Sequence, residues 1–134
     1  MKPVLRNKDK GNALIRYYKS FIHAVDGIIY ALKYEHNMII ILFAGLLAIL
    51  AGFTFNISEE EWLFVIIIIG LIAATEMINT SIEATIDLIT TKTHPLAKIA
   101  KDTASSASLI LSIAAFIGAL IIFIPKLIEV INVL

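Results

Sequence analysis

The chain has 134 residues, of which 59% are hydrophobic and 16% are charged, and its formal net charge is zero. Its mean hydropathy of +0.89 is far above that of an ordinary soluble domain, and the balanced charge gives no reason to expect nucleic acid as a partner. The absence of cysteine excludes disulfides, thiolate metal sites and thiol catalysis. The composition therefore predicts a single integral membrane domain over residues 1–134.

The first predicted element is an amphipathic helix over residues 12–36. Apolar side chains recur at helical spacing from Leu14 to Leu32, and basic residues such as Arg16 and Lys19 lie between them. A helix with one apolar and one basic side suits the surface of a membrane.

Three later segments are long and apolar enough to cross the hydrocarbon core, which takes about 20 helical residues. They cover residues 38–55, 62–89 and 104–124, and Pro125 is expected to close the third. The predicted fold class is therefore all-α integral membrane, with an N-terminal amphipathic surface helix and three transmembrane helices.

Basic residues predict the orientation in the cell membrane. The N-terminal region is rich in lysine and arginine, and the predicted loop 90–103 carries Lys92, Lys98 and Lys101. The loop after the first span has only acidic charges at residues 59–61, which we expect to be solvated. By the positive-inside rule the N-terminus and the 90–103 loop are cytoplasmic and the C-terminus is outside.

The second span carries a row of polar side chains on one face. Glu76, Asn79, Glu83 and Asp87 fall within roughly 80° of arc on a helix. Ionisable groups at membrane depth usually mark a site rather than packing. With Trp62 at the outer interface, Glu76 lies roughly 21 Å along the helix, in the cytoplasmic third of the bilayer. The row therefore descends from water into lipid and can join a water-soluble cosubstrate to a lipid headgroup.

A second polar cluster, with Lys101, Asp102 and Ser105, opens the third span from the same side. Its serines are also typical of a packing face between membrane helices, and a lysine here also serves as a topology signal. Carboxylates with an asparagine and a lysine suit Mg²⁺-dependent phosphoryl transfer, although neither GxxxxGK[ST] nor GxGxxG occurs. The residues alone leave open a proton-coupled transporter and a structural membrane protein without turnover.

The polar row resembles the signature of a known family of small, three-span lipid kinases. The segment Glu76-x-x-Asn79-Thr80-x-Ile82-Glu83-x-x-x-Asp87 is similar to that of the prokaryotic diacylglycerol kinase family. The resemblance runs in order from about Arg16 to Pro125, and its form is similar to the Gram-positive undecaprenol kinase branch. Further matching segments are Phe21-Ile-His-Ala with Gly27, Glu35-His-Asn37, and His94-Pro-Leu-Ala-Lys-Ile-Ala-Lys101-Asp102.

The resemblance implies roles for particular residues of this chain. Glu76 corresponds to the base that takes the proton from the lipid hydroxyl, and Asn79 orients phosphate or metal. Glu35 and Glu83 bind Mg²⁺ together with the nucleotide phosphates, and Ser105 lies where the family approaches the lipid. Further nucleotide contacts are implied for Arg16, Lys92, Thr93, His94, Lys101 and Asp102.

The expected activity is transfer of the γ-phosphate of ATP, with Mg²⁺, to the terminal hydroxyl of undecaprenol. Diacylglycerol is the alternative lipid acceptor, and a proton-coupled transporter that uses Glu76 is the alternative of another class. The family also implies a homotrimer whose active sites are shared between neighbouring protomers. No role is implied for Asp87, which can pair with a basic residue instead of touching substrate.

Overall fold

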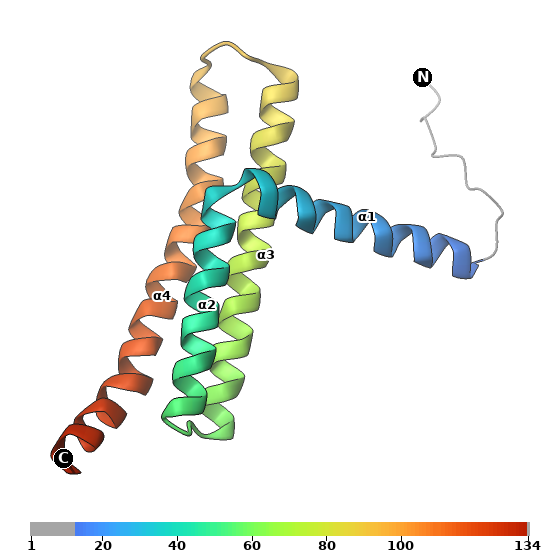
Figure 1. The fold of residues 1–134 in the computed structure, drawn as a ribbon. Helices are drawn as coiled ribbons and strands as arrows, with labels where there is room; N and C mark the ends of the chain where they lie inside the picture. Colours follow the sequence, from blue (N-terminus) through green and yellow to red (C-terminus); the bar gives the residue numbers. More distant parts are fainter. Residues whose placement is uncertain (1–12, 134) are drawn as a thin grey trace.

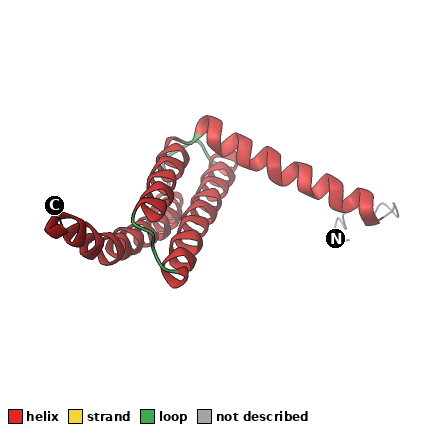
Figure 2. Cartoon of the chain, turned by 60° about the horizontal axis from the view of Figure 1, so that its bottom comes forward, coloured by secondary structure: helices red, strands yellow, loops and turns green. Residues whose placement is uncertain are grey.

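The structure, a computed structural model, describes residues 13–133, which form helices joined by short loops. The helices are α1 (Ala13–Tyr34), α2 (His36–Thr54), α3 (Glu59–Ile89) and α4 (Pro95–Val133). Helices α2, α3 and α4 lie side by side, and α1 projects from one end of α2 at a steep angle (Figures 1 and 2). Three of these helices, α2, α3 and α4, are long and apolar enough to cross a membrane.

The beginnings of α3 and α4 follow from local hydrogen bonds. At α3, Ser58 and Glu61 form a reciprocal capping box: Glu61 N donates to Ser58 Oγ at 3.3 Å, and Ser58 N donates to the Glu61 carboxylate at 2.7 Å. At α4, Leu96 N donates to His94 Nδ1 at 3.2 Å, and Pro95 takes the first helical position, where its missing N–H costs nothing.

Several helix boundaries differ from those expected: α2 covers His36–Thr54 where 38–55 was predicted, and α3 begins at Glu59 where 62 was predicted. Helix α4 runs through Pro125, so the prediction that this proline closes the third span was wrong. A membrane helix tolerates the loss of the one backbone hydrogen bond that a proline cannot make. Residues 95–103, predicted as loop, are also helical. Helix α1 ends at Tyr34, short of the predicted 36, because Glu35 has an extended backbone with φ −103° and ψ 110°. Residue 12, its predicted start, lies outside the described residues.

Helix α3 is the centre of the bundle, because α2 and α4 each pack against it and have little contact with one another. Near the end of the bundle opposite α1, Ile57, Val65 and Ile122 form the buried core cluster. At Gly118 of α4 the ring of Phe64 from α3 lies directly over the glycine, since a Cβ there would lie only 2.2 Å from Phe64 Cζ.

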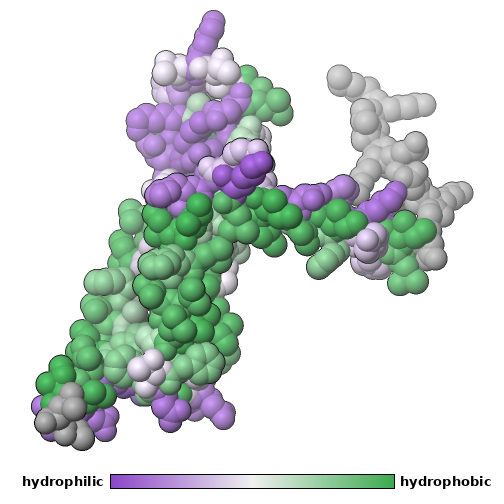
Figure 3. Space-filling model, viewed as in Figure 1, coloured by the Kyte–Doolittle hydropathy of each residue, from purple (hydrophilic) through white to green (hydrophobic). Residues whose placement is uncertain are grey.

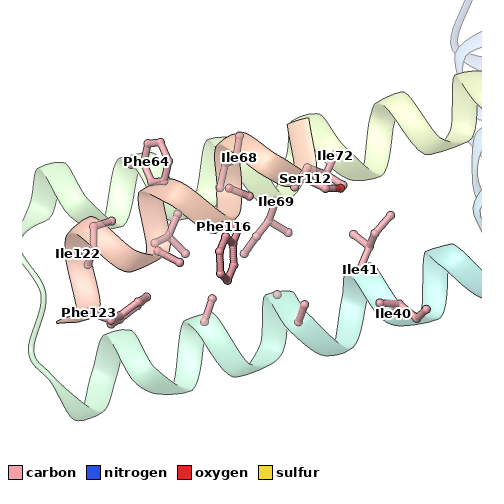
Figure 4. Close-up of a pocket in the computed structure, with 16 residues that line it drawn as sticks. Ile40, Ile41, Phe64, Ile68, Ile69, Ile72, Ser112, Phe116, Ile122 and Phe123 are labelled. Atoms are coloured by element: carbon pink, nitrogen blue, oxygen red, sulfur yellow. The ribbon is translucent and has the colours of Figure 1, made fainter. Parts of the chain in front are cut away.

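A mostly apolar cavity of about 350 Å³ lies between α2, α3 and α4 (Figure 4). Phe116 points from α4 into this space, Ile72 lines its end nearer the polar row, and Ser112 is its one polar lining residue. Most large apolar side chains of the three helices remain exposed in the single chain, and Figure 3 shows them covering the bundle. This surface suits lipid or further copies of the chain, as expected of a membrane protein.

Helix α1 contacts the bundle only near its C-terminal end. Ala31 is its one buried residue, and Gly27 faces Met77 of α3 at 3.7 Å from the position of an added Cβ. In the view of Figure 3, hydrophilic residues lie mainly along the upper edge of α1 and hydrophobic ones mainly along the lower edge. The contact fixes the corner between α1 and α2 against the middle of α3.

Candidate active site

The polar row of α3 has its deepest member at Glu76, which is only 2% exposed. Asn37 Nδ2, in the first turn of α2, donates to Glu76 Oε1 at 2.9 Å. The second carboxylate oxygen, Oε2, makes no hydrogen bond with a described residue. Because burial of a carboxylate is costly without compensating donors, the hydrogen bond from Asn37 at the start of α2 stabilises this group.

The next turn of α3 places Asn79 beside Glu83. Asn79 is 6% exposed, and its Nδ2 donates to Glu83 Oε1 at 3.2 Å. Its Oδ1 is buried and has no hydrogen-bond partner among the described residues. A buried acceptor without a partner is unusual and calls for a ligand, an ion or a water molecule. The amide oxygen and the neighbouring carboxylate together form a donor set of the kind that Mg²⁺ prefers.

The antiparallel pairing of α3 and α4 determines which polar groups of the two helices lie at the same height along the bundle. Lys101 Nζ contacts Asp87 Oδ1 at 2.6 Å, which confirms that Asp87 can pair with a basic residue. Counting inward from this pair puts Thr80 level with Ser108, and both hydroxyl oxygens are buried without a partner among the described residues. The same count puts Glu76 level with Ser112, at the cavity, so the buried carboxylate and the apolar space lie at neighbouring depths.

Beyond the membrane-facing part, α3 and α4 continue upward as a polar hairpin that bears the other nucleotide candidates (Figure 3). Asp102 is paired with Lys98 of its own helix, and both side chains are exposed. Exposed pairs of this kind contribute little stability. The ring of His94 caps α4, and Lys92 and Thr93 are exposed in the loop.

Several predicted site residues are not brought together in one chain. Arg16 is exposed on α1, roughly 28 Å along that helix from Glu35 at about 1.5 Å per residue. Its guanidinium lies 5.9 Å from the centroid of the Tyr17 ring instead. Glu35 is half-buried at the corner, and Ser105 is exposed on α4. Within residues 13–133 no group of three or more His, Asp or Glu is close enough to hold a metal ion.

Sequence reasoning missed the contacts of two residues, Asn37 and Glu61. Asn37 lies in a segment that matches the family, but the resemblance implies no role for it, and its position two residues after Glu35 is the one signal in the sequence. Glu61 was expected to be a solvated charge, but it accepts from Ser58 N and contacts Lys126 Nζ at 3.2 Å. That second pair joins α3 to α4 at the end of the bundle away from Glu76.

Three helices able to cross a membrane, with a carboxylate buried between two of them, define a small helical membrane protein with a built polar site. The model of the family described as prokaryotic diacylglycerol kinase matches residues 22–123. The chain belongs to this family, and it is a membrane lipid kinase.

Several relatives cover most of the chain, among them an undecaprenol kinase and a diacylglycerol kinase. The undecaprenol kinase of Bacillus subtilis (strain 168) is 41% identical over 121 residues, which are 90% of this chain and 98% of that protein. A diacylglycerol kinase of Helicobacter pylori (strain J99) is 37% identical over 101 residues, which are 75% of this chain and 79% of that protein. The relatives therefore agree on a lipid acceptor and differ in which lipid they are named for.

Proposed function

We propose that this protein transfers the γ-phosphate of ATP to the terminal hydroxyl of undecaprenol. The observation that carries the proposal is the burial of Glu76, 2% exposed and held by a neutral donor at the inner end of the polar row. The high coverage by an undecaprenol kinase supports this acceptor. Diacylglycerol is the second candidate, favoured by the diacylglycerol kinases among the relatives.

In the proposed reaction Glu76 is the general base. Asn37 occupies Oε1, so Oε2 is the oxygen left to accept the proton of the lipid hydroxyl. The hydroxyl O–H bond breaks as the oxygen forms a bond to the γ-phosphorus, and the bond from that phosphorus to the bridging oxygen breaks. ADP leaves with the electron pair, and the proton remains on Glu76.

The cavity supports an acceptor with a long hydrocarbon chain. Its lining is apolar except for Ser112, which lies level with Glu76. A lipid whose hydroxyl is at Glu76 can extend its chain along Ile72 into this space without exposing it to water. A water-soluble acceptor would gain nothing from such a surface.

The proposal includes Mg²⁺, for which the donor set is suitable. Glu83 and the unpaired Asn79 Oδ1 would hold the ion, with Glu35 as a further carboxylate. When bound, the ion supplies charge neutralisation on the phosphate oxygens. We assign nucleotide contacts to Lys101 and Asp102, and to Arg16, Lys92, Thr93 and His94, with Glu35 and Glu83 next to the phosphates.

A homotrimer with shared sites completes this assignment. Arg16 lies too far from Glu76 of its own chain to share a nucleotide with it, but α1 of a neighbouring protomer can supply the residue. The exposed apolar surface of α2, α3 and α4 supports such association. The basic N-terminal region and the two-sided α1 support a position for α1 on the cytoplasmic membrane surface, with the C-terminus outside.

Purified protein in detergent tests the function. With radiolabelled ATP and Mg²⁺, we expect label in undecaprenyl phosphate, a lower rate with diacylglycerol, and none without Mg²⁺. Glu76→Gln keeps the size of the side chain and an oxygen for Asn37 but removes the base, so turnover should fall by about 10²- to 10⁴-fold. No transfer to any lipid alcohol, together with a proton-driven flux in liposomes, would establish the transporter instead.

A further inference from the structure

Asn37 is the one described residue whose side chain donates a hydrogen bond to Glu76. The two residues lie 39 positions apart in the sequence, and the contact joins α2 to α3 at the buried end of the polar row. Neither the signature on α3 nor the expected metal and nucleotide contacts include Asn37. In the function proposed above its amide only occupies Oε1 of Glu76, and no effect on the rate of the reaction is assigned to it.

A hydrogen bond from a neutral amide suits a carboxylate that acts as a general base better than an ion pair would. A buried carboxylate needs a hydrogen-bond donor to replace the water that it has lost. A lysine or arginine would supply one, but its positive charge would make the carboxylate a much weaker base. The amide of asparagine is neutral and cannot itself take the proton in the pH range of an enzyme. It thus compensates for burial and leaves the carboxylate able to accept a proton.

The contact also selects a geometry. The Glu76 side chain has several rotatable bonds, and holding it in one arrangement costs conformational entropy. A donor fixed at Oε1 restricts the rotation of the carboxylate and leaves Oε2 for the acceptor hydroxyl. Orientation of reacting groups before the chemical step is a large part of enzymatic rate enhancement.

The backbone supports Asn37 from an anchored corner. Glu35 is extended between two helices, so α2 begins at His36 and presents Asn37 in its first turn. On the other side of the corner, Gly27 of α1 lies against Met77, the residue after Glu76. Helix α1 and the Asn37 amide therefore contact the same turn of α3, which fixes the amide relative to the carboxylate.

We propose that Asn37 is a positioning residue of the lipid kinase reaction, which orients the Glu76 carboxylate for proton transfer through its Nδ2–H. The inference rests on the function proposed above for Glu76. Its rival is a purely structural role, in which the hydrogen bond only holds α2 against α3. If Asn37 positions Glu76, the effect of replacing Asn37 on turnover depends on the geometry of the Glu76 carboxylate. If its role is purely structural, the effect does not depend on that geometry.

A double-mutant cycle separates them. Asn37→Leu keeps the branched shape of the side chain and removes the donor, and Asn37→Ala removes both. In the native background each should lower kcat by roughly 10- to 100-fold, the size of one hydrogen bond to a charged group, with KM for ATP and undecaprenol nearly unchanged. In a Glu76→Asp background, whose carboxylate is withdrawn by one methylene, the same changes should lower kcat by less than about threefold.

Thr75→Val is the matched control, because the Thr75 hydroxyl donates only within its own helix, to Leu71 O at 2.7 Å. It should leave kcat within about twofold, since the change is confined to the helix surface. Equal losses from the Asn37 changes in both backgrounds, or a loss that follows only a drop in Tm, would overturn the inference. So would near-native kcat in Asn37→Leu. If Glu76→Gln retains turnover, the proposed base itself is wrong, which is a separate outcome.

Discussion

The substitution Asn79→Asp turns the amide beside Glu83 into a second carboxylate of nearly the same size. Asn79 Nδ2 lies 3.2 Å from Glu83 Oε1, so the new oxygen faces another at about that distance. Two unit charges 3.2 Å apart repel by roughly 5 kcal/mol at an effective dielectric constant of about 20. Rotation of the partly exposed Glu83 and uptake of a proton reduce this, which leaves about 1–3 kcal/mol of lost stability.

Mg²⁺ should reverse the loss if both side chains face one ion. A ligand at about 100 times its Kd stabilises a protein by roughly 2.7 kcal/mol, enough to offset the repulsion. The assay is thermal unfolding in detergent, with chelator and with Mg²⁺. We expect the Tm of the variant to lie several degrees below native in chelator and to rise with Mg²⁺ by more than the native value does.

Asn56→Asp is the matched control, because it makes the same change at an exposed loop position. Asn56 has a φ of 48°, a conformation that aspartate also tolerates. Its Tm should respond to Mg²⁺ as the native protein does. An Asn79→Asp protein that is as stable as native in chelator, or that gains nothing extra from Mg²⁺, would refute the placement of Asn79 and Glu83 around one cation.

Three further substitutions test other parts of the structure. Lys101→Met should raise KM for ATP several-fold in steady-state kinetics and hardly change Tm, because its exposed ion pair is worth about 0.2–1 kcal/mol; an unchanged KM would exclude Lys101 from the nucleotide site. Ser58→Ala removes the N-cap of α3 and should lower the free energy of unfolding by about 1 kcal/mol, seen as a lower Tm, while kcat is unaffected. Gly118→Ala should lower Tm because its Cβ meets Phe64 at 2.2 Å, whereas Gly70→Ala, with no atom within 4 Å, should not; a loss at Gly70 instead would show a second copy packed there.

The apolar runs predicted α2 and α3 well because a predominantly apolar segment of about 20 residues admits few structures other than a membrane helix. The ends of helices were less predictable. Whether Pro125 ends or merely interrupts a helix depends on its neighbours, and the break at Glu35 is a backbone conformation that apolar periodicity does not report. A boundary is decided by one or two residues, so a pattern summed over many says little about it.

In the site, too, contacts within one helix were predictable from the sequence and contacts between helices were not. The row from Glu76 to Glu83 was predictable because helical geometry alone puts those side chains on one face, and the Asn79–Glu83 contact lies within that row. The Asn37–Glu76 hydrogen bond requires two helices to meet, and no local spacing encodes it. The ion pair of Glu61 with Lys126 was missed for the same reason.

The two ion pairs between α3 and α4 make this hairpin sensitive to the thickness of its membrane. Glu61–Lys126 and Asp87–Lys101 stand at opposite ends of α3, roughly 39 Å apart at about 1.5 Å per residue. A bilayer measures about 30 Å across its hydrocarbon and about 40–45 Å with headgroups, so both pairs fit the two headgroup layers at once. A thicker membrane would draw one charged pair into hydrocarbon, and a thinner one would tilt the hairpin. A change in membrane thickness would therefore shift the depth of Glu76, and we expect turnover to vary with the chain length of the host lipid.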